Sequence, residues 1–161
     1  MGLKPGAPLA AAILCLLAAA SLALAAETTR AEYTARVEPI CKASTQANKK
    51  ILAGVREEVK QGKLKPAAAQ FAKASSALKK TLAKLKAVPQ PAADKARLTD
   101  WLGYVAEEAE LFKKASLKLA AGNKAAAEAI VARLQYTATI ANNEVVAFEF
   151  TWCRLEPSKF T

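Results

Sequence analysis

Five acidic side chains in the second half of the chain are spaced so that some of them could act together: Glu107, Glu108, Glu110, Glu144 and Glu149. On a helix, residues 107 and 110 share a face, and residue 144 can approach from a later helix. Such oxygen ligands bind Ca²⁺, and a carboxyl group can serve as a general acid. The alternative is a solvated acidic face offset by Lys113 and Lys114, with Glu110 and Lys114 four residues apart. We expect this alternative, because runs of charge usually face water.

The chain contains no histidine, and this absence removes most catalytic and metal-binding arrangements. It excludes the Ser-His-Asp and Cys-His pairings, the His-Glu-x-x-His zinc site, the Glu-x-x-His pair of di-iron bundles and covalent haem attachment. No glycine-rich phosphate loop occurs either. An enzyme would have to use Glu, Lys, Tyr or Ser, with a strongly perturbed carboxylate or lysine in a cleft. We therefore expect a protein that is not an enzyme and that carries no cofactor and no metal.

Three cysteines are present, and Cys15 lies in an apolar N-terminal segment. If that segment is removed on export, Cys41 and Cys153 remain as an even pair, which in an oxidising compartment predicts a disulfide. The bridge would close a loop of roughly a hundred residues and stabilise the fold by about 4–5 kcal/mol. The alternative is two buried, unpaired thiols.

Lysine is distributed unevenly, because residues 59–93 hold eight lysines and no acidic residue. Six of them form the candidate binding surface: Lys60, Lys63, Lys65, Lys73, Lys80 and Lys84. On a helix, Lys73, Lys80 and Lys84 share one face, which fits an anionic partner such as an envelope polymer or lipid headgroups. The alternative is a solvated face that aids solubility. Nucleic acid is not expected, because the chain reads as exported and no aromatic residue lies between the lysines of the stretch 79–86.

The first 26 residues have the three parts of a secretory signal peptide. Lys4 supplies a charge, residues 9–20 form an unbroken apolar run, and Ala23-Leu24-Ala25 fits the small-x-small cleavage rule. We expect cleavage near residue 26 and a secreted or periplasmic protein. The alternatives are an uncleaved segment that anchors the protein in the membrane and a lipidated Cys15.

Residues 27–161 have the length of a single domain, a net charge of +9 and a composition rich in good helix formers. Apolar residues at spacings of three and four predict four amphipathic helices, at about 30–61, 66–87, 92–121 and 124–155. Long helices with short connections favour antiparallel neighbours. The expected fold is therefore all-α, an antiparallel up-down-up-down four-helix bundle with one disulfide.

Local signals indicate where these helices begin, bend and end. Thr29 and Glu32 match a capping box before the first helix, and Gly62 ends that helix. Pro39 is expected to kink or break it near residues 35–38. Pro66 suits the first position of the second helix.

The cysteines agree with this topology. Cys41 falls in the first half of the first helix and Cys153 in the last turn of the fourth, so that both lie at the same pole. Neighbouring antiparallel helices would then bring them within bridging distance. Phe148 and Trp152 near this pole are expected in the core, with a ligand pocket opposite Tyr33 as the alternative. Ala and Ser at many apolar-stripe positions allow close helix contact or leave a narrow cavity.

A small set of residues gives the chain a family resemblance: Tyr33, Ile40-Cys41, Trp101-Leu102, Phe150 and Cys153. With these short motifs it is similar to small exported bacterial helical-bundle proteins of unknown function, over most of residues 27–161. The resemblance implies an envelope or secreted location and a Cys41–Cys153 bridge, and it implies no activity. We expect an exported, non-enzymatic protein that binds an anionic partner through its Lys-rich helix. The alternative is a carrier or sensor that holds a small apolar ligand in the bundle interior.

Overall fold

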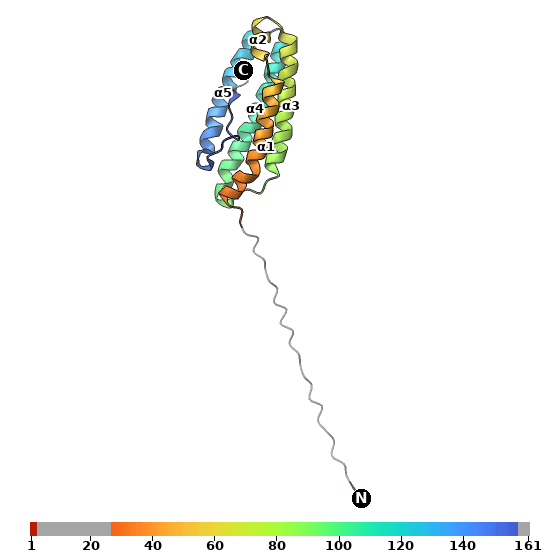
Figure 1. Cartoon of the computed structure of the whole chain (residues 1–161), viewed down its shortest axis with the longest axis vertical. Helices are drawn as coiled ribbons and strands as arrows, with labels where there is room; N and C mark the ends of the chain where they lie inside the picture. Colours follow the sequence, from red (N-terminus) through yellow and green to blue (C-terminus); the bar gives the residue numbers. More distant parts are fainter. Residues whose placement is uncertain (3–26, 158–161) are drawn as a thin grey trace.

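The computed structural model describes residues 1–2 and 27–157, and this part of the chain is helical with no β-strand. Four long helices run alternately up and down, with one short helix in a connection (Figure 1). The elements are α1 (Arg30–Ile51), α2 (Val55–Lys60), α3 (Leu64–Lys86), α4 (Lys95–Ala120) and α5 (Lys124–Glu144), with 3-10 turns at Ala92–Asp94 and Val146–Phe148. The predicted all-α antiparallel four-helix bundle is confirmed. The predicted signal peptide, residues 1–26, lies almost entirely outside the described residues.

The first predicted helix is divided in two, and the division is not at Pro39. The capping box is present, since Thr29 Oγ1 accepts from the amide of Glu32 at 3.2 Å and the Glu32 carboxylate accepts from the amide of Thr29 at 2.8 Å. Helix α1 then continues through Pro39 to residue 51, so the predicted break near residues 35–38 is wrong. The chain turns instead at Gly54, whose φ of 80° is a conformation that glycine adopts without strain.

Helices α3 and α4 occupy nearly the predicted ranges. Helix α3 begins at Leu64, so that Pro66 is its third residue, where the missing amide proton has no helical partner in any case. Two hydroxyl groups cross between these helices: Ser75 donates to the carbonyl of Ala109 and Ser116 donates to the carbonyl of Ala68, each at 2.7 Å. Close helix contact and a narrow cavity were the two outcomes expected for the small side chains. Between α3 and α4 the outcome is close contact.

The predicted fourth helix over 124–155 is wrong after residue 144. Helix α5 ends at Glu144, and after the 3-10 turn Glu149 takes a φ of 51°, which reverses the chain. Residues 149–157, which we call the C-terminal strap, then run back along the bundle beside α1 and α5 (Figure 1). The side chain of Asn142 holds the strap to α5, because its amide donates to the carbonyl of Leu155 at 3.0 Å and its oxygen accepts the Leu155 amide at 2.8 Å.

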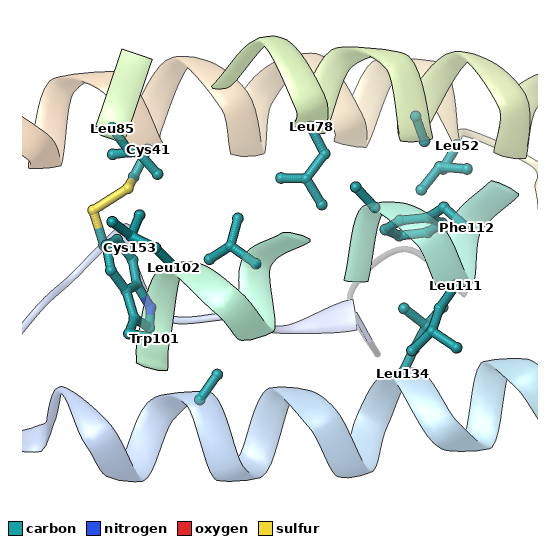
Figure 2. Close-up of a cluster of buried hydrophobic side chains, with 14 of the residues drawn as sticks. Cys41, Leu52, Leu78, Leu85, Trp101, Leu102, Leu111, Phe112, Leu134 and Cys153 are labelled. Carbon is teal, nitrogen blue, oxygen red and sulfur yellow. A yellow bond between two sulfur atoms is a disulfide. The ribbon is translucent and has the colours of Figure 1, made fainter. Parts of the chain in front are cut away.

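The core runs along the length of the bundle. Figure 2 shows Trp101 beside the disulfide and, further along, Phe112 with Leu111 and Leu134. Buried aromatic rings close the end near the strap: Phe148 lies 5.9 Å from Tyr33 and 5.2 Å from Phe150, and Phe150 lies 5.5 Å from Trp101, measured between ring centroids. No helix in the described residues is both long enough and apolar enough to cross a membrane.

Candidate functional site

The six predicted lysines are all exposed, but the structure divides them into two groups. Lys60, Lys63 and Lys65 surround the turn between α2 and α3, while Lys73, Lys80 and Lys84 follow the outer side of α3. From residue 65 to residue 84 the helix rises by about 28 Å. Within residues 27–157 none of the six forms an ion pair, whereas the neighbouring Lys79 pairs with Glu110. We call these six residues the basic surface.

An open groove of about 230 Å³ lies where α2, α3 and α5 meet, and we call it the α2 groove. Its apolar side chains are Val55, Val59, Phe71 and Val131. Its charged side chains are Arg56, Lys60, Lys124 and Glu128, and the last two pair at 3.8 Å. Only Lys60 among these was a sequence candidate. The others were missed because the break after residue 51, which turns α2 toward α5, was not predicted.

The five acidic candidates do not assemble into one site. Glu107 pairs with Arg133 at 2.9 Å and Glu110 pairs with Lys79, both on the outside of the bundle, as expected for an acidic face. In the described residues no group of three or more His, Cys, Asp or Glu side chains is placed to hold a metal ion. Glu108 contradicts the expectation of a solvated face, because it is only 5% exposed.

Glu108 is buried because it belongs to the inward side of α4, with Trp101, Val105 and Phe112 at helical spacings of three and four. These residues line a cavity of about 50 Å³ between α1, α3, α4 and the strap, which we call the Glu108 cavity. Its carboxyl group has no hydrogen-bond or ion-pair partner among the residues that the structure describes. Burial raises the pKa of Glu108 to about 8.

This carboxyl group meets the requirement stated above for an enzyme, a strongly perturbed carboxylate in a cleft. Its neighbours, however, offer little for catalysis. Thr81 Oγ1 lies 2.9 Å from Ser44 Oγ and 3.2 Å from the carbonyl oxygen of Ala77 in its own helix, so both hydroxyl groups have hydrogen-bond partners already. No lining residue contributed by α1 or α3 can gain or lose a proton, since Cys41 is in a disulfide.

The Cys41–Cys153 disulfide is confirmed, with 5.0 Å between the Cα atoms. The predicted placement of Cys153 in a helix is wrong, because the bridge joins α1 to the strap. Glu38, one turn before Cys41, strengthens this link: its carboxylate accepts from the backbone amides of residues 151, 152 and 153 at 3.0 to 3.3 Å. The strap is therefore fixed to α1 by a covalent bond and a charged hydrogen-bonded cap.

The predicted aromatic cluster is correct in part. Phe148 is buried against Tyr33, so that the space opposite Tyr33 is filled by a ring and leaves no ligand pocket there. Burial raises the pKa of Tyr33 to about 12. Trp152 is not in the core as expected: it is 36% exposed, and Lys42 Nζ lies 5.2 Å from its ring centroid.

Comparison of the chain with known protein families, with curated protein sequences and with solved structures finds no match. Any functional conclusion therefore depends on the residues described above.

Proposed function

We propose that this chain is an exported, non-enzymatic bundle protein that binds an anionic lipid surface through the basic surface and the α2 groove. One observation carries the proposal: the structure exposes six lysines without ion pairs, and one of them, Lys60, lines a groove that is apolar inside and has mainly basic charges at its edge. Export, through cleavage of residues 1–26, belongs to the proposal. The disulfide supports it, since such bonds persist mainly in oxidising compartments.

The shape of the basic surface supports an extended partner. Lysines spread over about 28 Å of helix are too far apart to converge on one small anion, but they can face a plane of headgroups. A polyanionic envelope polymer would satisfy the lysines equally well. The α2 groove favours lipid, because Arg56 and Lys60 can bind a phosphate while Val59 and Phe71 contact an acyl chain.

The alternative function, carriage of a small apolar ligand inside the bundle, has less support. The Glu108 cavity is about 50 Å³, whereas an apolar cavity that binds benzene measures about 150 Å³. It also contains a carboxyl group, which would have to be desolvated against an apolar ligand.

The proposal is tested with protein purified from cells that export it and with vesicles of phosphatidylcholine, with or without phosphatidylglycerol. A triple Lys→Gln variant at positions 73, 80 and 84 is compared with a matched triple variant at Lys113, Lys114 and Lys118, which are exposed on α4. Each basic residue near an anionic leaflet contributes about 1 kcal/mol, so the first variant should bind roughly 100-fold more weakly. The control should lose much less.

Added salt should weaken wild-type binding steeply, because exposed charges are screened. Equal losses in the two variants, or retention that ignores salt, would refute the proposed surface. Retention on an anionic wall polymer without retention on anionic vesicles would replace lipid by polymer as the partner.

A further inference from the structure

The Glu108 cavity contains polar atoms that the fold leaves without partners. Asn48 Oδ1 and Trp101 Nε1, which belong to two of its lining residues, are buried and have no hydrogen-bond partner. The Glu108 carboxyl group is the other polar group that the fold buries here. Most buried polar groups in proteins are paired, because an unpaired one keeps its full desolvation cost. The two possible acceptors, Asn48 Oδ1 and a Glu108 carboxylate, therefore indicate a site for a hydrogen-bond donor. The Trp101 N–H is itself a donor and cannot accept from such a ligand.

Asn48 of α1 and Glu108 of α4 line the cavity from different helices. Helices α1 and α4 run in the same direction (Figure 1), and Figure 2 shows Trp101 beside the disulfide of Cys41, both residues lining the cavity. Asn48 follows Cys41 by seven residues, and Glu108 follows Trp101 by seven. Since seven residues make about two helical turns, Asn48 and Glu108 reach the same level of the bundle, on the same inward faces.

The surrounding rings add a second kind of recognition. Trp101, Phe112 and Trp152 line the cavity together with the carboxyl group. Aromatic faces attract organic cations, most strongly when water is excluded. Trp152 already holds one ammonium group, because Lys42 Nζ lies 5.2 Å from its centroid. A carboxylate, an amide oxygen and aromatic faces together match an ammonium group that donates hydrogen bonds.

We propose that the Glu108 cavity binds the ammonium head of a small organic cation, which donates hydrogen bonds to Glu108 and Asn48 and lies against the ring of Trp101. The volume of about 50 Å³ admits only a few heavy atoms, so the cavity selects a compact head. A longer ligand can extend past Arg154, which is exposed at the strap side of the cavity.

Binding is coupled to a proton. The carboxyl group is protonated below its pKa of about 8, and the cation binds the carboxylate, so one proton leaves for each ammonium bound. The other charged groups that line the cavity are Arg154 and Glu156 of the strap, and α1 and α3 contribute none. Apparent affinity should therefore rise about tenfold per pH unit from pH 6 to pH 8 and then level off.

Methylammonium chloride is the probe, titrated into the exported protein and followed by the NMR signal of the Trp101 indole N–H. We expect saturation in the millimolar range, as befits a ligand of two heavy atoms. Glu108→Gln, which keeps the side-chain shape, should weaken binding at least tenfold. Glu107→Gln, at the neighbouring half-buried position paired with Arg133 on the outside of the bundle, should bind like the wild type.

Three results would overturn the proposal. The absence of a saturable response would mean that the cavity holds only water. Equal binding by the wild type and Glu108→Gln would place the site elsewhere. An equal response to potassium chloride would show a site for inorganic cations, in which the aromatic rings have no role.

Discussion

Replacing Glu108 by glutamine should stabilise the protein at neutral pH and leave its stability in acid nearly unchanged. Burial raises the pKa of Glu108 from 4.5 to about 8, so between these values the folded chain keeps a proton that the unfolded chain has lost. The free energy of unfolding must then fall as the pH rises through this window. The amide of glutamine has no proton to lose, so the variant lacks this dependence.

The size of the effect follows from the shift. One pKa unit corresponds to about 1.4 kcal/mol, so the wild type should lose about 3 kcal/mol of stability between pH 4.5 and pH 7 through this group alone. The loss should stop near pH 8, where the folded protein also releases the proton. At pH 4 the difference between wild type and variant measures only the exchange of a carboxylic acid for an amide.

Urea unfolding at pH 4, 5.5, 7 and 8, followed by circular dichroism, measures both proteins, with an unchanged m-value as the condition for comparison. Glu107→Gln is the control, because its carboxylate is paired with Arg133 on the outside of the bundle. The stability difference between the Glu108 variant and wild type should widen with pH, while that of the control stays nearly constant. Parallel curves for the wild type and the Glu108 variant would refute the argument.

Three further variants test how the strap and the helix break are held. Replacing Cys41 and Cys153 by alanine should lower the free energy of unfolding by about 4–5 kcal/mol, measured in urea, since the bridge joins positions 112 residues apart; a loss below 1 kcal/mol would contradict this account. Glu38→Gln should cost about 1–2 kcal/mol and speed hydrogen exchange at the amides of residues 151–153, which a purely electrostatic surface role would leave unchanged. Gly54→Ala should cost about 1 kcal/mol, because its φ of 80° strains any residue with a Cβ; an unchanged urea midpoint would show that the turn tolerates alanine.

The sequence was sufficient for the fold class and for the disulfide. Apolar residues recur at spacings of three and four through the chain. This spacing indicates the inward face of a helix, and it does so without knowledge of which segments pack against that face. The prediction of the disulfide depended only on the number of cysteines and on the expected oxidising compartment. Neither inference required knowledge of contacts between distant segments.

The strap was missed because its residues keep a helical pattern. Val145, Phe148 and Leu155 continue the apolar spacing of α5, and all three pack on the core, although the helix ends at residue 144. What ends it is tertiary: Asn142 bonds to the backbone of Leu155, and Glu38 caps the strap from another helix. The weak helix formers near residue 142 indicated that the helix could end there, but the prediction gave more weight to the apolar spacing, which continues beyond it.

The burial of Glu108 was not predicted, because this candidate stands between two acids, Glu107 and Glu110, that lie on the outside of the bundle. Its position three residues after Val105 and four before Phe112 places it on the buried stripe of α4, and this was readable from the sequence. A charged residue on such a stripe is usually displaced toward solvent or paired. Whether the Glu108 carboxyl group has a partner depends on residues of α1, α3 and the strap. Their positions around Glu108 could not be predicted from the sequence.

Stability measurements can also decide whether the strap is what keeps water from Glu108. If the disulfide and the buried carboxyl group acted independently, Glu108→Gln would add about 3 kcal/mol at pH 7 in the Cys41→Ala, Cys153→Ala background as well. We expect less than about 1 kcal/mol there, because a released strap lets water reach the carboxyl group and returns its pKa toward the ordinary value. A full gain in that background would mean that the three helices alone enclose the cavity, and that the strap only lies against it.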